Sequence, residues 1–261
     1  MLIKGRVLTV FMSMILAFGL FISSCGDDDD DDGGNRNSIE KAKSTFAQNF
    51  PKLQEGAPGV STYVAQCYED TMKKTGKSYR ETDILSMGDS TIAQIATMYL
   101  STDTECSNPI MRAVRVVSYT KTGTVNLSNE PGKTAEKYKM DLLAMYLGGD
   151  SAYRNEIGSI MGVEEEVLDI FAGGEVYSYN ISRIQNESEL TQKEKDKLLK
   201  DYEIIRIEDN VLYMDDQDSS DTIVDASDID DPHAENVEDS ERGYFIKWPT
   251  VLDREHPFYK R

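Results

Sequence analysis

The spacing of apolar residues predicts helices in the first part of the chain. Apolar positions repeat every three or four residues, which places them on one face of a helix, in residues 39–50, 60–76 and 89–99. Asn37 followed three residues later by Glu40 is typical of a helix start. Pro51 ends the first segment, and Gly76 is suited to end the second.

The pattern changes at Ile110, where alternating and β-branched residues predict strands. Residues 110–119 form the first such strand, and residues 176–184 alternate in the same way. We expect hairpin turns at residues 122–123 and 209–210, which carry Thr-Gly and Asp-Asn between strand-like segments.

Helical spacing returns between the predicted strands. Residues 135–145 carry it, with a Gly-Gly pair at 148–149 as the cap, and shorter helices are predicted at 151–161 and 164–172. Thr191 with Glu194 forms a capping box that opens a lysine-rich helix. The whole pattern predicts an α+β fold, in which N-terminal helices precede a mixed or antiparallel sheet with hairpins.

Acidic residues are concentrated in two segments. The 261-residue chain has a formal net charge of −19, and six consecutive aspartates occupy residues 27–32. Residues 207–241 hold fourteen further acids and neither lysine nor arginine. Within them, residues 215–241 lack apolar periodicity, so we expect an acidic, flexible and disordered loop there. Closely spaced carboxylates also suit Ca²⁺, but no frame of this loop gives the EF-hand pattern.

The remainder of the chain is nearly neutral. Residues 33–206 contain 25 acidic and 21 basic side chains. They form no basic stripe that would neutralise phosphates, and this excludes nucleic acid as the expected partner.

The chain has three cysteines and two histidines. None of the cysteines has a second thiol or a histidine at ligand spacing, so no metal or other cofactor is predicted.

The N-terminal segment has the layout of a secretory signal peptide. Lys4 and Arg6 precede an apolar run at residues 7–22, and two serines stand directly before Cys25. Sixteen helical residues span roughly 24 Å, which is less than the hydrocarbon core of a bilayer. The alternative is a single-pass anchor in which Cys25 is an incidental thiol.

The sequence Ile-Ser-Ser-Cys at residues 22–25 resembles a bacterial lipobox, and the aspartate run after it resembles the export signal of surface lipoproteins of the Bacteroidota. These resemblances imply that Cys25 is acylated and that the lipid holds the protein on the outer face of the outer membrane. The aspartate run also fits a passive, solvated tether. We therefore expect a signal peptide at residues 1–24, a lipidated acidic tether at 25–37 and a single α+β domain at 38–261.

Acylation of Cys25 leaves Cys67 and Cys106 as a pair in an oxidising compartment, which predicts a disulfide bond. The bond would close a loop of about 40 residues and stabilise the fold by roughly 4 kcal/mol in the chain-entropy model. The alternative is two separate buried thiols.

Three short motifs resemble the sequence blocks of the SGNH (GDSL-type) esterases and lipases. They are Gly-Asp-Ser at residues 88–90, Gly-Gly-Asp at 148–150 and Asp-Arg-Glu-His-Pro at 253–257. The resemblance implies Ser90 as nucleophile with Asp253 and His256 as its partners. The second motif lacks the asparagine of the family block, and Gly-Asp-Ser is equally typical of a helix start.

Aromatic side chains in the predicted strands offer a surface for glycans or protein partners, or else form the inward face of the sheet. They are Tyr177, Tyr179, Tyr202, Tyr213, Tyr244 and Trp248. The sequence as a whole favours a surface-exposed, lipid-anchored outer-membrane protein with a noncatalytic binding role at the envelope. Its expected partner is an unidentified envelope or extracellular protein or glycan, and the alternative is an SGNH-like ester hydrolase.

Overall fold

The computed structural model describes residues 38–163, 168, 175–179, 181–215, 222–230, 234, 236–240 and 242–261. Cys25, the predicted leader and the predicted tether lie outside the described residues. So do almost all of the predicted helix at 164–172 and part of the predicted acidic loop. Among the described residues, no helix is long and apolar enough to cross a bilayer.

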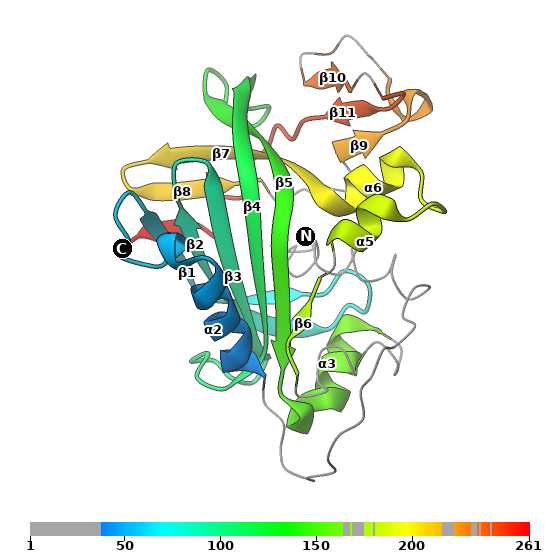
Figure 1. Cartoon of the computed structure of the whole chain (residues 1–261). Helices are drawn as coiled ribbons and strands as arrows, with labels where there is room; N and C mark the ends of the chain where they lie inside the picture. Colours follow the sequence, from blue (N-terminus) through cyan, green and yellow to red (C-terminus); the bar gives the residue numbers. More distant parts are fainter. Residues whose placement is uncertain are drawn as a thin grey trace.

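Eight antiparallel strands close into a barrel that follows the order of the chain (Figure 1). They are β1 (Ser61–Thr71), β2 (Ser78–Met87), β3 (Thr91–Leu100), β4 (Pro109–Asn126), β5 (Thr134–Gly149), β7 (Lys200–Glu208), β8 (Val211–Met214) and β12 (Phe258–Lys260). The last strand, β12, pairs with both β8 and β1 and so closes the ring. Because the ring is closed, each barrel strand pairs with a neighbour on both sides over at least part of its length.

The predicted α+β fold with N-terminal helices is wrong. Residues 60–76, 89–99 and 135–145, each predicted as a helix, contribute strands β1, β3 and β5 instead. The first predicted helix is correct, because residues 39–50 contain α2 (Ile39–Asn49). The chain is therefore mainly a β-barrel with a few short helices, rather than helices followed by a sheet.

Burial on both faces explains why β3 resembles a helix in sequence. Ile92 and Ala96 belong to the cluster inside the barrel, whereas Ala93 and Ile95 pack on the outer face in a cluster that includes residues of α2. A strand that is apolar on both faces has apolar residues at three- and four-residue spacing as well as at alternate positions. Periodicity alone therefore cannot separate such a strand from a buried helix.

Helix α2 lies along the outside of the barrel against β4 and β5 (Figure 1). The backbone N–H of Ser38, just before the helix, donates to the carbonyl of Gly149 at 3.0 Å. A Cβ atom at Gly148 would lie 2.3 Å from the Ser38 carbonyl oxygen, so the close approach of the two chains requires glycine. The glycine pair that was predicted to cap a helix instead ends β5. It leaves room for the backbone at Ser38, where the chain enters α2.

Two turn predictions have different outcomes. The hairpin at residues 209–210 is confirmed, since it joins β7 to β8 with positive φ at both Asp209 and Asn210. The hairpin predicted at residues 122–123 is wrong, because β4 runs straight through it and only a register shift between Lys121 and Gly123 marks the place.

Short elements fill the connections between the barrel strands. They are η1 (Pro51–Leu53), η2 (Ser151–Tyr153), α3 (Arg154–Met161), β6 (Tyr177–Ser178), α5 (Ile181–Asn186) and α6 (Gln192–Leu199). The predicted strand at 176–184 is thus a two-residue strand followed by a helix. The capping box at Thr191 and Glu194 is confirmed at the start of α6.

A second, three-stranded sheet covers part of the outer barrel surface, at the top right of Figure 1. Its strands are β9 (Ile223–Val224), β10 (Val237–Asp239) and β11 (Phe245–Lys247). Trp248 and Ile246 pack there against Tyr202 and Ile204 of β7 in a separate buried cluster. The acidic segment predicted to be a flexible loop therefore contributes two strands, together with the short helix η3 (Ala226–Asp228).

The structure brings Cys67 and Cys106 together as a disulfide-bonded pair, with their Cα atoms 5.9 Å apart. The predicted pairing is confirmed, although Cys67 lies on strand β1 and not on a helix. Its position falls within the register shift of β1 between Ala65 and Tyr68. The bond joins this irregular part of β1 to the turn between β3 and β4.

Candidate functional site

A polar groove lies outside the barrel, where β5 and β7 meet the three-stranded sheet and helix α6. Two adjoining hollows of about 360 and 370 Å³ form it, and both are lined by Asp141, Lys200 and Arg242. Asp141 and Lys200 are directly opposite each other on β5 and β7. The groove therefore has a strand floor from the barrel and walls from elements far away in sequence.

Glu238 of β10 fastens one wall of the groove to the barrel. Its carboxylate accepts hydrogen bonds from Lys139 at 2.7 Å and from the Trp248 indole at 3.0 Å, and Lys137 lies 3.4 Å away. Burial raises the pKa of Glu238, but the bonds from Lys139 and Trp248 outweigh burial and hold the pKa below its usual value. Glu238 is therefore an anion at neutral pH that holds two lysines.

Asp196 of α6 fastens the other wall. Its carboxylate accepts bonds from Arg242 at 2.7 Å and Gln192 at 3.0 Å, and it is also bonded to the Tyr244 hydroxyl. Lys200 lies 3.4 Å from it. Burial raises the pKa of Asp196, but these hydrogen bonds and the charge of Lys200 leave it lowered overall.

The charges that line the groove are balanced. The cations are Lys139, Lys195, Lys200 and Arg242, and the anions are Asp141, Asp196, Glu238 and Asp239. Two of these anions, Asp196 and Glu238, are occupied in holding the walls, whereas Asp141 is exposed at the edge that both hollows share. A balanced lining offers donors and acceptors together, and it gives no long-range attraction for a highly charged ligand.

Four of the six aromatics predicted as a binding surface are buried, and Tyr177 and Tyr213 are half-buried against the core clusters. Trp248, Tyr244 and Tyr202 are buried with exposed fractions of 1, 2 and 4 %. They belong to the cluster that joins the second sheet to the barrel. Their role is to position the groove walls, because they are covered by packing between the outer barrel surface and the second sheet rather than exposed for binding.

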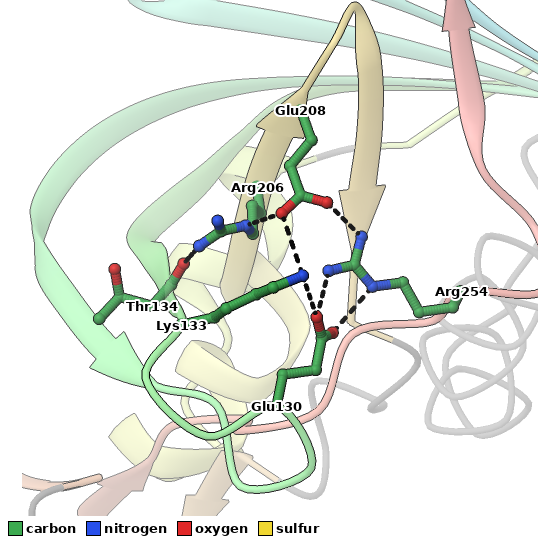
Figure 2. Close-up of polar contacts among 6 residues, drawn as sticks. All are labelled: Glu130, Lys133, Thr134, Arg206, Glu208 and Arg254. Atoms are coloured by element: carbon green, nitrogen blue, oxygen red, sulfur yellow. Dashed lines mark hydrogen bonds and ion pairs between the residues drawn. The ribbon is translucent and has the colours of Figure 1, made fainter.

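An ion-pair network at the C-terminal segment joins two barrel turns (Figure 2). Arg254 donates to both oxygens of Glu130 at 2.8 and 2.7 Å and to Glu208 at 2.9 Å. Arg206 donates to the other Glu208 oxygen at 2.6 Å. The bonds from Arg254 and Lys133 lower the pKa of Glu130 to about 2. Glu130 and Glu208 are both already paired with arginine and lysine side chains. The network therefore ties the β4–β5 turn to the β7–β8 hairpin and leaves neither carboxylate unpaired for a ligand.

Of the three SGNH-like residues, the structure brings two together. His256 Nδ1 lies 2.9 Å from Asp253 Oδ2, and the His256 ring packs against Tyr68 with 4.4 Å between ring centroids. Tyr68 is paired in register with Glu81 of β2.

Ser90 lies elsewhere, in the turn that joins β2 to β3. That turn follows Met87, six residues beyond Glu81 along β2, which corresponds to roughly 20 Å at the rise of a strand. Ser90 therefore does not meet the His256–Asp253 pair. The barrel also differs from the alternating strand–helix fold that the resemblance implied.

Sequence reasoning missed the groove. Asp141, Lys200 and Arg242 come from β5, from the start of β7 and from the connection between β10 and β11. No motif links them, since each is an ordinary charged residue in its own segment. The single local signal was the capping box of α6, which fixes the helix that carries Asp196.

No protein-family model matches the chain, and no curated protein matches its sequence. Within the described residues, no group of three or more histidine, cysteine, aspartate or glutamate side chains is placed to hold a metal ion. The candidate site is therefore defined by its geometry alone.

Proposed function

We propose that this chain is a lipid-anchored binding protein of the outer membrane surface, with a noncatalytic role. The lipobox and the aspartate run support the location. The balanced polar groove between the barrel, the second sheet and α6 supports the binding role and is the single observation that carries it. No hydrolase function is proposed, because Ser90 lies apart from His256 and Asp253.

The groove suits a small hydrophilic ligand without a large net charge. Its volume is that of a small-molecule site, and its lining supplies carboxylates, ammonium groups and a guanidinium within one hollow. Such a lining can satisfy the hydroxyl and amide groups of an oligosaccharide or a short peptide. A nucleic acid is disfavoured because acids offset every base in the groove.

Replacing Cys25 with alanine is expected to release the protein from the membrane fraction and to abolish its labelling by radioactive fatty acid. Acyl chains contribute about 0.8 kcal/mol of membrane affinity per buried methylene, and the variant lacks the thiol that would carry them. Cell fractionation of the full-length wild type and variant measures the difference. Unchanged membrane retention of the variant would contradict the lipid anchor.

A second variant in the same experiment separates membrane anchoring from exposure on the outer face of the outer membrane. Replacement of all six aspartates at residues 27–32 by alanine should leave acylation intact and reduce digestion of the protein by protease added to intact cells. Equal digestion of this variant and the wild type would mean that the run serves only as a tether, while the lipid anchor would still stand.

The groove itself is tested by replacing Asp141 with alanine. We expect saturable binding of at least one member of a panel of neutral oligosaccharides and short peptides to the mature wild type, with NMR shift changes at groove residues. The variant should bind at least tenfold more weakly, because a lost charge-assisted hydrogen bond is worth about 1.5 kcal/mol or more. Asp141 is exposed, so the fold should tolerate the change.

Glu105→Ala provides the matched control, as it removes an exposed acid from the β3–β4 turn, which contributes no residue to either hollow. Binding that this control weakens as much as Asp141→Ala would place the ligand outside the groove. Absence of saturable binding across the panel would contradict the binding role.

A further inference from the structure

The inward face of β2 carries carboxyl groups where a barrel normally carries apolar side chains. Tyr79, Glu81, Asp83 and Leu85 alternate as the buried positions of this strand. Tyr79 and Leu85 belong to the cluster inside the barrel, so the two acids between them face the same interior. Asp70 of β1 is directly opposite Tyr79 and adds a third acid.

These three acids are withdrawn from solvent. Asp70, Glu81 and Asp83 each have an exposed fraction of 1 %. Asp83 accepts a hydrogen bond from the Tyr68 hydroxyl at 2.7 Å, and Asp70 accepts one from the Tyr79 hydroxyl at 3.0 Å. Neither oxygen of Glu81 has a hydrogen bond of ordinary geometry. Of the three buried acids, Glu81 therefore has the fewest hydrogen bonds to offset the cost of burying its charge.

Among the described residues, the groups that act most strongly on the Glu81 carboxyl are acids and a tyrosine hydroxyl rather than cations. The titratable groups on its own and neighbouring strands are Tyr79, Asp83, Tyr68 and Asp70. His256, paired with Asp253, packs on Tyr68. Arg115, Asp201 and Glu203 form a separate group on β4 and β7. The residue opposite Glu81 on β3 is the uncharged Met98. Arg115 donates to Asp201 at 2.5 Å and lies 3.6 Å from Glu203, so its charge is committed to β7.

We propose that Glu81 is a proton-binding site of the barrel interior, where it holds a proton at neutral pH against the neighbouring Asp83 carboxylate. Two carboxylates side by side in a medium of low dielectric repel each other strongly, and burial penalises each charge separately. One proton removes one of the two charges. Asp83 already accepts the Tyr68 hydroxyl bond, so Glu81 is the member that keeps the proton.

Because of this proton, the folded state should become less stable as the pH rises. Burial, followed by the charges of Asp83 and Asp70, raises the pKa of Glu81 well above its ordinary value of 4.5. Above pH 4.5 the unfolded chain therefore loses a proton that the folded chain retains. Each further pH unit lowers the ratio of folded to unfolded protein by up to about tenfold for this proton, until the folded-state pKa is reached.

The experiment compares urea unfolding of the full chain with that of Glu81→Gln at pH 6 and pH 8. Glutamine has the shape and neutral charge of the protonated acid, so the variant should lose less stability over this interval than the wild type. The expected difference is up to about 100-fold in the folded-to-unfolded ratio over the two pH units. His256 is present in both proteins, so the difference between their curves reports the change at residue 81.

Glu69→Gln is the matched control, since Glu69 lies on the adjacent strand β1 with its side chain 54 % exposed, paired with Arg80. It should retain the pH dependence of the wild type. Parallel curves for wild type and Glu81→Gln would overturn the proposal.

An infrared difference spectrum at pH 7 gives a second readout that does not depend on unfolding. Wild type minus Glu81→Gln should contain the C=O band of a protonated carboxyl group, and its absence would overturn the proposal as well. If Glu81→Gln fails to fold, Asp83→Asn takes its place in the unfolding comparison. It removes the repelling charge and should likewise reduce the loss of stability between pH 6 and 8, and an unchanged loss would count against the proposal.

Discussion

Replacing Arg115 with methionine is expected to lower the free energy of unfolding by about 3–5 kcal/mol, the largest single effect we anticipate in this chain. The Arg115 side chain is 5 % exposed, and those of Asp201 and Glu203 are 2 and 11 % exposed. Removal of the guanidinium leaves two buried carboxyls facing each other without a cation. Urea unfolding at pH 7 measures the loss.

Lys121→Met on the same strand is the control for this prediction. Lys121 and its partner Glu136 have exposed side chains, and such a pair is worth about 0–1 kcal/mol. Burial and the charge of Asp201 raise the pKa of Glu203, so the defect of Arg115→Met should shrink toward pH 5 as Glu203 takes up a proton. A loss in Arg115→Met that is no larger than that of Lys121→Met would contradict a stabilising role for the buried guanidinium.

Loss of the Cys67–Cys106 disulfide is expected to lower the free energy of unfolding by about 2–5 kcal/mol. The bond spans 39 residues of sequence, for which the chain-entropy model gives about 4 kcal/mol. It constrains the unfolded chain across β2 and β3. The measurement is urea unfolding of the mature protein with and without reductant.

The double variant Cys67→Ala, Cys106→Ala supplies the control for reduction. It should match the stability of the reduced wild type, and reductant should not change it further. Titration of denatured, unreduced wild type should find neither cysteine as a free thiol. Two titratable thiols in that sample would contradict the bond.

Features that depend on neighbouring residues were predictable from sequence. The capping box at Thr191 and Glu194 was correct because both partners lie within one helical turn. The hairpin at residues 209–210 was correct because Asp and Asn tolerate the positive φ that its turn requires. The cysteine pairing was also correct. It followed from the expected oxidising compartment and from the two cysteines left once Cys25 is set aside, rather than from geometry.

Strands β1, β3 and β5 were mistaken for helices, and no strand was predicted at β2. β3 is buried on its inner face by the barrel and on its outer face by α2. In β1 the register shift between Ala65 and Tyr68 breaks the alternation that marks a strand. In β2 the inward acids Glu81 and Asp83 replace the apolar residues that a pattern search expects.

The sequence by itself determined the disulfide partners, the capping box of α6 and the turn at residues 209–210, because each depends on the chemistry of adjacent residues or on residue type. Only the tertiary structure decided that the strands close into a barrel, that Glu81 lies beside Asp83 inside it, and that Asp141, Lys200 and Arg242 share one groove. These arrangements depend on contacts between segments that are far apart in the chain. Their stability comes from burial and pairing that exist only once the barrel has closed.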